Sequence, residues 1–129
     1  MSRDRGIRLQ NALAAYLRQW WPAAESAGSG RNGSDVIGTP GIMWECKTAT
    51  DFKRDFKPTQ WVEQSRMHAR LSELDGIPVP VVVYYPAGVG AENTGNTLAI
   101  MPLHVLMRLL IESDHTPVTP DMVTQLEKL

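Results

Sequence analysis

The longest apolar run in the chain is Val79–Tyr85 (VPVVVYY), which is rich in β-branched and aromatic residues. Such residues favour a β-strand, and the run is far too short to span a bilayer. Segments with helical periodicity precede and follow the run, so helices are available to cover the strand. This arrangement predicts an α/β fold in which helices flank a mixed central sheet.

The other elements follow from hydrophobic periodicity and from turn residues. Apolar residues at helical spacing, such as Leu9 and Leu13, indicate a first helix, which Pro22 should end. Gly38–Gly41 is typical of a tight hairpin connection, whereas residues 50–57 and 88–95 are expected to be loops. The expected elements are helices over 4–21, 58–74 and 103–111, strands over 35–37, 42–48, 79–85 and 98–101, and a short terminal helix from Thr119.

The length of 129 residues predicts one domain over residues 1–129, with a basic N-terminal arm at 1–8 and a C-terminal tail at 113–129 that carries the short helix. The single cysteine, Cys46, cannot form an internal disulfide, and no apolar segment of a signal peptide follows the first arginines. We therefore expect a cytoplasmic protein without membrane attachment, located in the host cytoplasm if a phage encodes it.

Charge is distributed unevenly along the chain, although the net charge is only −1. Residues 1–70 hold 11 of the 13 Lys and Arg residues and 7 of the 14 Asp and Glu residues. A phosphate-binding face is expected to come from this half, whereas the alternative is chance asymmetry on a solvated surface. The basic residues expected to contact DNA are Arg3, Arg5, Arg8, Arg31, Lys53, Arg54 and Lys57.

Asp35, Glu45 and Lys47 are the residues that most need an explanation. Because side chains alternate along a strand, Glu45 and Lys47 share one face of strand 42–48, while Cys46 points the other way. Asp35 lies on the preceding strand, and the turn between the strands should bring the two carboxylates together. Partly buried carboxylates are costly unless compensated, and Mg²⁺ takes oxygen ligands of this kind. The alternative is an exposed cross-strand ion pair, worth about 0–1 kcal/mol.

The segments Gly33–Ile37 (GSDVI) and Trp44–Lys47 (WECK) resemble the PD-(D/E)XK nuclease superfamily, over about residues 3–101. Within it, the chain looks most like the small Holliday-junction resolvases of archaea and phages. The resemblance implies a restriction-endonuclease-like core with the order αβββαβ. It also implies that Asp35 and Glu45 bind the metal, that Cys46 lends its backbone carbonyl, and that Lys47 assists the attacking water.

The resemblance also draws attention to glutamines on the first two helices. Gln10 stands where the superfamily often has a metal-binding glutamate, so either Gln10 is a weak outer ligand or another acid, such as Glu25, substitutes. Many relatives have a glutamine on the second helix that reaches the active site, and Gln64 is expected here, with Gln60 second. The alternative is a pair of amides at the edge of the core. The expected stripe of this helix, core in its C-terminal part, is Gln60, Gln64, Met67, Leu71 and Leu74.

Several other residues receive weaker interpretations. Trp20 and Trp44 fit core positions, whereas Trp61, Phe52 and Phe56 are better candidates for contact with substrate or partner. The three histidines lack metal-ligand spacing, and His68 is interpreted as a surface or half-buried side chain, with a position near Gln64 as the alternative. The very apolar helix 103–111 is expected either to be buried against the sheet or to form a subunit interface.

These expectations combine into one functional hypothesis, a DNA endonuclease that uses Mg²⁺, or Mn²⁺ as a substitute. The favoured substrate is a four-way junction, whose two symmetric cuts would require a homodimer. One alternative is a stand-alone repair or single-strand nuclease of the same superfamily. Another is a DNA-binding or interaction module that has kept the fold and lost the chemistry, although the presence of Asp35, Glu45 and Lys47 argues against it.

Overall fold

A three-stranded sheet forms the centre of the protein, whose structure is a computed structural model. Its strands are β3 (Ile42–Thr48), β4 (Val79–Tyr85) and β5 (Leu98–Ile100), in that spatial order. β3 and β4 are parallel and β4 and β5 are antiparallel, which confirms the predicted mixed sheet. The structure describes residues 3–28, 33–49, 51–71 and 78–116.

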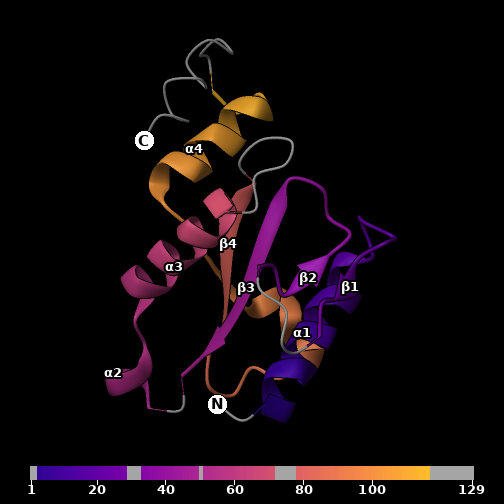
Figure 1. Ribbon diagram of the computed structural model, residues 1–129, viewed down its shortest axis with the longest axis vertical. Coiled ribbons are helices and arrows are strands. Elements are labelled where there is room, and N and C mark those ends of the chain that lie inside the picture. Colours follow the sequence, from indigo (N-terminus) through magenta and orange to yellow (C-terminus); the bar gives the residue numbers. More distant parts are fainter. Residues whose placement is uncertain (1–2, 29–32, 50, 72–77, 117–129) are drawn as a thin grey trace.

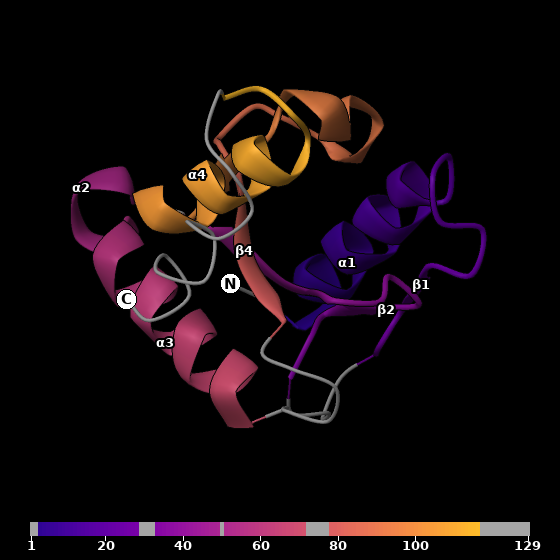
Figure 2. The same cartoon turned by 90° about the horizontal axis from the view of Figure 1, so that it is seen from above.

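Helices cover both faces of the sheet, with α1 (Arg3–Leu17) on one side and α3 (Pro58–Leu71) on the other (Figures 1 and 2). Every residue of β4 is buried, and its side chains alternate between two hydrophobic clusters, one on each face of the sheet. The odd-numbered residues of β4 join the cluster on the α1 side, and Val82 and Tyr84 join the cluster on the α3 side. The predicted α/β class with flanking helices is therefore confirmed.

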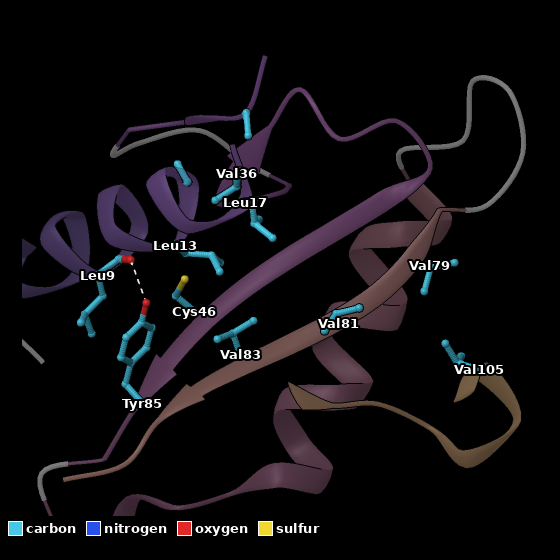
Figure 3. Packing of buried hydrophobic residues seen from close by; sticks show 12 residues of the cluster. Leu9, Leu13, Leu17, Val36, Cys46, Val79, Val81, Val83, Tyr85 and Val105 are labelled. Carbon is cyan, nitrogen blue, oxygen red and sulfur yellow. Dashed lines mark hydrogen bonds between the residues drawn. The ribbon is translucent and has the colours of Figure 1, made fainter. Parts of the chain in front are cut away.

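The α1 cluster contains Leu9 and Leu13 from the helix, packed near Cys46 and Val83 of the sheet (Figure 3). Tyr85 completes this side of the core, because its hydroxyl donates to the Leu9 carbonyl oxygen at 3.5 Å. The same hydroxyl lies 3.1 Å from Oγ1 of Thr94, in the 3₁₀ helix η1 (Ala91–Asn96). Residues 91–95, expected to belong to a loop, are therefore folded and packed against α1.

The buried face of α3 differs from the predicted stripe. Its buried residues are Trp61, Ser65 and Ala69, at intervals of four, and the two small side chains let the helix approach the sheet. Met67 and Leu71 are 55% and 80% exposed, so the expectation of a core there was wrong. Trp61 is 8% exposed and belongs to the core, contrary to the expectation of a substrate contact. Leu74 lies outside the described residues.

Two short strands, β1 (Glu25–Ser26) and β2 (Val36–Ile37), form a separate antiparallel pair beside β3. The predicted tight turn at Gly38–Gly41 is present, and the Ile42 N–H donates to the Thr39 carbonyl. Gly38 has a φ of +86°, and a Cβ there would lie 2.1 Å from the Ala23 carbonyl oxygen. Only glycine satisfies both conditions, so this residue permits the close approach of the turn to the chain before β1.

Helix α1 begins and ends earlier than predicted. Because it already includes Arg3, residues 3–8 of the expected basic N-terminal arm form the first turns of a helix. The helix ends at Leu17, where the Trp20 N–H bonds to the Leu17 carbonyl and turns the chain. Trp20 is consequently 58% exposed and contacts the Tyr16 ring edge-on at 5.2 Å, so its core assignment was wrong.

The remaining elements are α2 (Phe52–Asp55), in a segment expected to be a loop, and α4 (Leu103–Glu112). In α4 only Val105 is buried, while Leu103 and Leu106 are 72% and 40% exposed, so the helix is partly covered. No helix in the described ranges combines the length and the apolar character needed to cross a membrane. The expected helix from Thr119 lies outside those ranges, as does Arg31.

Candidate active site

The side chains of β3 alternate as predicted, so its charged side chains lie on one face and those that join the hydrophobic cluster on the α1 side lie on the other. Trp44 and Cys46 face the α1 cluster, where Trp44 is half-buried and Cys46 is buried. Glu45 and Lys47 point to the opposite face, toward α3. The core prediction for Trp44 is therefore confirmed, and the two charged residues share the face that the sequence pattern indicated.

Asp35 immediately precedes β2 and is joined to the middle of β3. Its main-chain N–H donates to the Trp44 carbonyl at 2.7 Å, and the Ser34 hydroxyl accepts from the Trp44 N–H at 2.9 Å. The Asp35 carboxylate then accepts a hydrogen bond of 2.7 Å from the Cys46 N–H. These bonds hold the Asp35 carboxylate beside the peptide that links Glu45 to Lys47.

The ionised form of Asp35 is disfavoured in this position. The pKa of the Asp35 carboxyl is raised from its ordinary 3.8 to about 6, mainly because burial disfavours the charged form and also because the Glu45 carboxylate is nearby. The hydrogen bond from the Cys46 N–H and the positive charge of Lys47 act in the opposite direction. A cation at this position would offset both the burial and the repulsion between the carboxylates.

Two side chains lie beside the carboxylate of Glu45, whose side chain is 13% exposed. Lys47 Nζ lies 3.4 Å from Glu45 Oε1, and His68 Nδ1 lies 3.9 Å from Glu45 Oε2. Lys47 Nζ also donates to Oε1 of Gln64 at 3.5 Å. β3 and α3 thus bring two charged residues, an amide and an imidazole into one group.

Gln64 therefore lies beside Lys47, whereas for Gln60 no such contact is found and the residue is exposed on the preceding turn of α3. His68 belongs to this group, whereas the sequence interpretation favoured a surface or half-buried side chain over a place near Gln64. A usable signal was present: His68 follows Gln64 by four residues, and residues so spaced share a helix face. Any glutamine on α3 that reaches the site brings His68 with it.

Cys46 contributes through its main chain and not through its thiol. Burial raises the pKa of the Cys46 thiol far above its ordinary range, which argues against a nucleophilic thiolate. Along a strand, the N–H and C=O of one residue point to the same side. Because the Cys46 N–H points to Asp35, its carbonyl is directed to that same edge of β3, away from β4. This direction agrees with the implied role of a main-chain ligand.

Gln10 and Glu25 lie near β1 but are not found in contact with the Glu45 group. The Gln10 amide oxygen accepts a hydrogen bond from the Ser26 hydroxyl at 3.3 Å. Ser26 pairs with Val36, the residue after Asp35, so this hydrogen bond joins Gln10 of α1 to the short β1–β2 sheet next to Asp35. Glu25 is exposed. The role of either residue toward a metal stays a prediction.

The donor set suits a cation that keeps part of its water shell. Within the described residues, no cluster of three or more His, Cys, Asp or Glu side chains is arranged to hold a metal. The implied set is smaller, with the carboxylates of Asp35 and Glu45 and the carbonyl of Cys46. Mg²⁺ commonly takes only one or two carboxylates, together with water and substrate phosphate oxygens. The residues present therefore fit this ion.

The basic residues lie at several positions around this end of the sheet. Arg5 of α1 donates to Thr48 Oγ1 at 3.4 Å, one residue beyond Lys47. Lys53, Arg54 and Lys57 are exposed on and after α2, which follows β3, and Arg54 pairs with Asp55 at 2.9 Å. Arg8 is exposed on α1, while the side chain of Arg3 is not described.

Comparisons with protein-family models, with curated proteins and with solved structures find no match to this chain. The function must therefore be inferred from the residues of the site and from their geometry.

Proposed function

We propose that this protein is a divalent-metal-dependent endonuclease that hydrolyses phosphodiester bonds in branched DNA. The observation that carries the proposal is the convergence of Asp35, Glu45 and Lys47 at one point of β3, with the Asp35 carboxylate bonded to the peptide between the other two. These are the residues that resemble the PD-(D/E)XK motif. The order of α1, the three strands β1 to β3, α3 and β4 agrees with the αβββαβ core of that superfamily.

The carboxylates of Asp35 and Glu45, with the Cys46 carbonyl, would hold Mg²⁺ or Mn²⁺. When bound, such an ion supplies Lewis-acid polarisation of the phosphoryl group. Lys47 contributes a fixed positive charge beside Glu45, where it can orient an attacking water or stabilise charge developing on the phosphate. The Gln64 amide oxygen accepts from Lys47 and so restricts the direction of the ammonium group.

Substrate choice is the finer part of the proposal. We assign four-way junctions as the preferred substrate and a homodimer as the active form, because paired cuts need two sites in fixed relation. The exposed Leu103 and Leu106 of α4 supply apolar surface for a symmetric contact. Exposed Phe52, beside basic residues, favours a second candidate, a repair nuclease that acts on single-stranded DNA.

A cleavage assay on matched substrates tests the proposal. Four-way, forked, single-stranded and linear duplex DNA of the same sequence are incubated with the protein in Mg²⁺ and in EDTA. We expect Mg²⁺-dependent cleavage of the four-way junction, a dimer in light scattering, and slower cleavage of linear duplex. Preference for single strands by a monomer would favour the repair nuclease. Binding without cleavage of any substrate would indicate a module that has lost the chemistry.

A further inference from the structure

An exposed aromatic ring lies on α2, the short helix that follows β3. The Phe52 side chain is 60% exposed, although one of its faces is covered by Phe56. The two ring centroids are 4.6 Å apart and the planes differ by 15°, which is a stacked arrangement. A ring stacked on one face and open to solvent on the other can accept one more flat ring, such as a nucleic-acid base.

The stack is anchored in the core of the protein. Phe56 contacts the ring of Trp61 edge-on at 5.4 Å and the ring of Tyr84 at 4.8 Å. Trp61 and Tyr84 are 8% and 3% exposed and belong to the cluster on the α3 side of the sheet. Phe52 is thus the most exposed ring of a cluster of four aromatic residues, and its support by Phe56 lowers the conformational freedom that is lost when another ring stacks on it.

The aromatic cluster begins next to the candidate active site. Tyr84 of β4 is the register partner of Lys47 of β3, and both side chains face α3. From Lys47, one strand spacing and two ring contacts lead to Phe52. Phe52 and Lys47 thus lie on the same side of the sheet, linked through the rings of Tyr84 and Phe56.

Positive charge accompanies the exposed ring. Lys53 and Lys57 are exposed on either side of Phe56, and Arg54 pairs with Asp55. Asp51, the N-cap of α2, has its main-chain N–H bonded to the same Asp55 carboxylate. A flexible ammonium group beside an aromatic face suits a strand that offers both phosphate charge and an unpaired base.

We propose that the open face of Phe52 stacks on an unpaired base of the DNA strand that enters the active site, while Lys53 and Lys57 hold its phosphates. This proposal rests on the proposed function only in assuming that the bound DNA strand leads to the candidate active site. The stacking contact requires that at least one nucleotide next to the cut be unstacked from its duplex. Junctions and forks that open at the branch point offer such a nucleotide, whereas an intact duplex does not.

Binding of a single-stranded oligonucleotide to the full chain in EDTA tests the stacking contact without any cleavage. Phe52→Ala should weaken binding by about 5- to 100-fold, and Phe52→Trp should restore it. Trp20→Ala is the matched control, because Trp20 is 58% exposed and lies at the end of α1; it should leave binding unchanged. Circular dichroism would check that each variant is folded.

Abasic oligonucleotides separate stacking from charge. A strand with the same phosphates and no bases should bind wild type and Phe52→Ala equally, because the ring has nothing to stack on. If Phe52→Ala binds normal single strands like wild type, or is weakened toward abasic strands to the same degree, the inference is overturned. If Phe52→Ala converts a dimer to a monomer without affecting DNA binding, the ring is a protein contact, which also overturns it. Stacking observed in a protein that cleaves no DNA would sustain this inference while contradicting the proposed nuclease.

Discussion

The main-chain N–H of Cys46 donates a hydrogen bond of 2.7 Å to Oδ2 of Asp35. One peptide in the middle of β3 thereby fixes a carboxylate that precedes β2 by one residue. The flanking residues, Glu45 and Lys47, place their side chains on the α3 face, and the Cys46 thiol enters the core on the α1 face. The hydrogen bond thus links β3 to the one carboxylate of the proposed metal site that comes from outside this strand.

This relationship predicts the pH dependence of stability in EDTA. The folded-state pKa of Asp35 is raised from 3.8 to about 6, so the protonated carboxyl favours the folded state. Wild type loses this contribution to its free energy of unfolding as the pH rises through 6. Asp35→Asn keeps an oxygen to accept the Cys46 N–H and has no charge to bury. We expect the variant to be more stable than wild type at pH 8, by on the order of 1–3 kcal/mol, and the difference to shrink toward pH 4.

Thermal unfolding of both proteins between pH 4 and 8 measures this difference. Titrating groups that do not interact with Asp35 are common to the two proteins and cancel in the comparison. Added Mg²⁺ should raise the melting temperature of wild type at pH 8 and leave that of Asp35→Asn unchanged. A difference in stability that does not vary with pH would show that Asp35 has an ordinary pKa.

Lys47 is expected to act through the position of its ammonium group. Lys47→Met should lower the rate of cleavage by on the order of 100-fold or more while Mg²⁺ still binds, because the carboxylates remain. Lys47→Arg should restore little activity, since a planar guanidinium cannot take the same place between Glu45 and Gln64. Cleavage by Lys47→Met at the wild-type rate would show that Lys47 is only an ion-pair partner of Glu45.

His68 is expected to position Glu45. Its Nδ1 lies 3.9 Å from Glu45 Oε2, and neighbours of a ligating carboxylate typically change metal affinity or activity by about 10- to 100-fold. We expect His68→Ala to raise the Mg²⁺ concentration needed for half-maximal cleavage, with less effect on the rate at saturating Mg²⁺. His115→Ala, an exposed position beyond α4, is the control. Equal Mg²⁺ dependence in both variants would exclude this role.

The basic residues around α2 are expected to contact phosphates. Changing Lys53, Arg54 and Lys57 together to alanine should weaken duplex binding and reduce the slope of log K against log salt by about 0.9 for each phosphate that is no longer neutralised. Arg54 already pairs with Asp55 at 2.9 Å, so we expect the two lysines to account for most of the change. An unchanged slope would place the DNA on another surface.

Local sequence patterns predicted the parts of the site that lie along one strand. Alternation placed Glu45 and Lys47 on one face and Cys46 on the other, and the glycines of the turn after β2 brought Asp35 back to β3. Residues that face each other across the fold were harder to predict. The pairing of β1 with β2, the 3₁₀ helix on α1 and the contact of His68 with Glu45 depend on packing between distant segments.

The errors on α3 have the same origin. Gln60, Gln64, Met67 and Leu71 fit an apolar stripe by spacing, but the helix buries Trp61, Ser65 and Ala69 instead. Small side chains carry little hydrophobic signal in a sequence, yet they are what allows a helix to lie close to a sheet. Trp61 was predicted to contact substrate or a partner, although it packs in the core against Phe56 and Tyr84.

The proposed function depends on Asp35 and Glu45 holding the metal that DNA cleavage requires. Its most direct test is the Mg²⁺-dependent cleavage of a labelled four-way junction by wild type, Asp35→Asn and Glu45→Gln, with binding of each to the same junction measured in EDTA. We expect cleavage by wild type only, with binding by both variants equal to or tighter than that of wild type, because repulsion of phosphate decreases. Full cleavage by either variant, or no Mg²⁺-dependent cleavage by wild type, would contradict it.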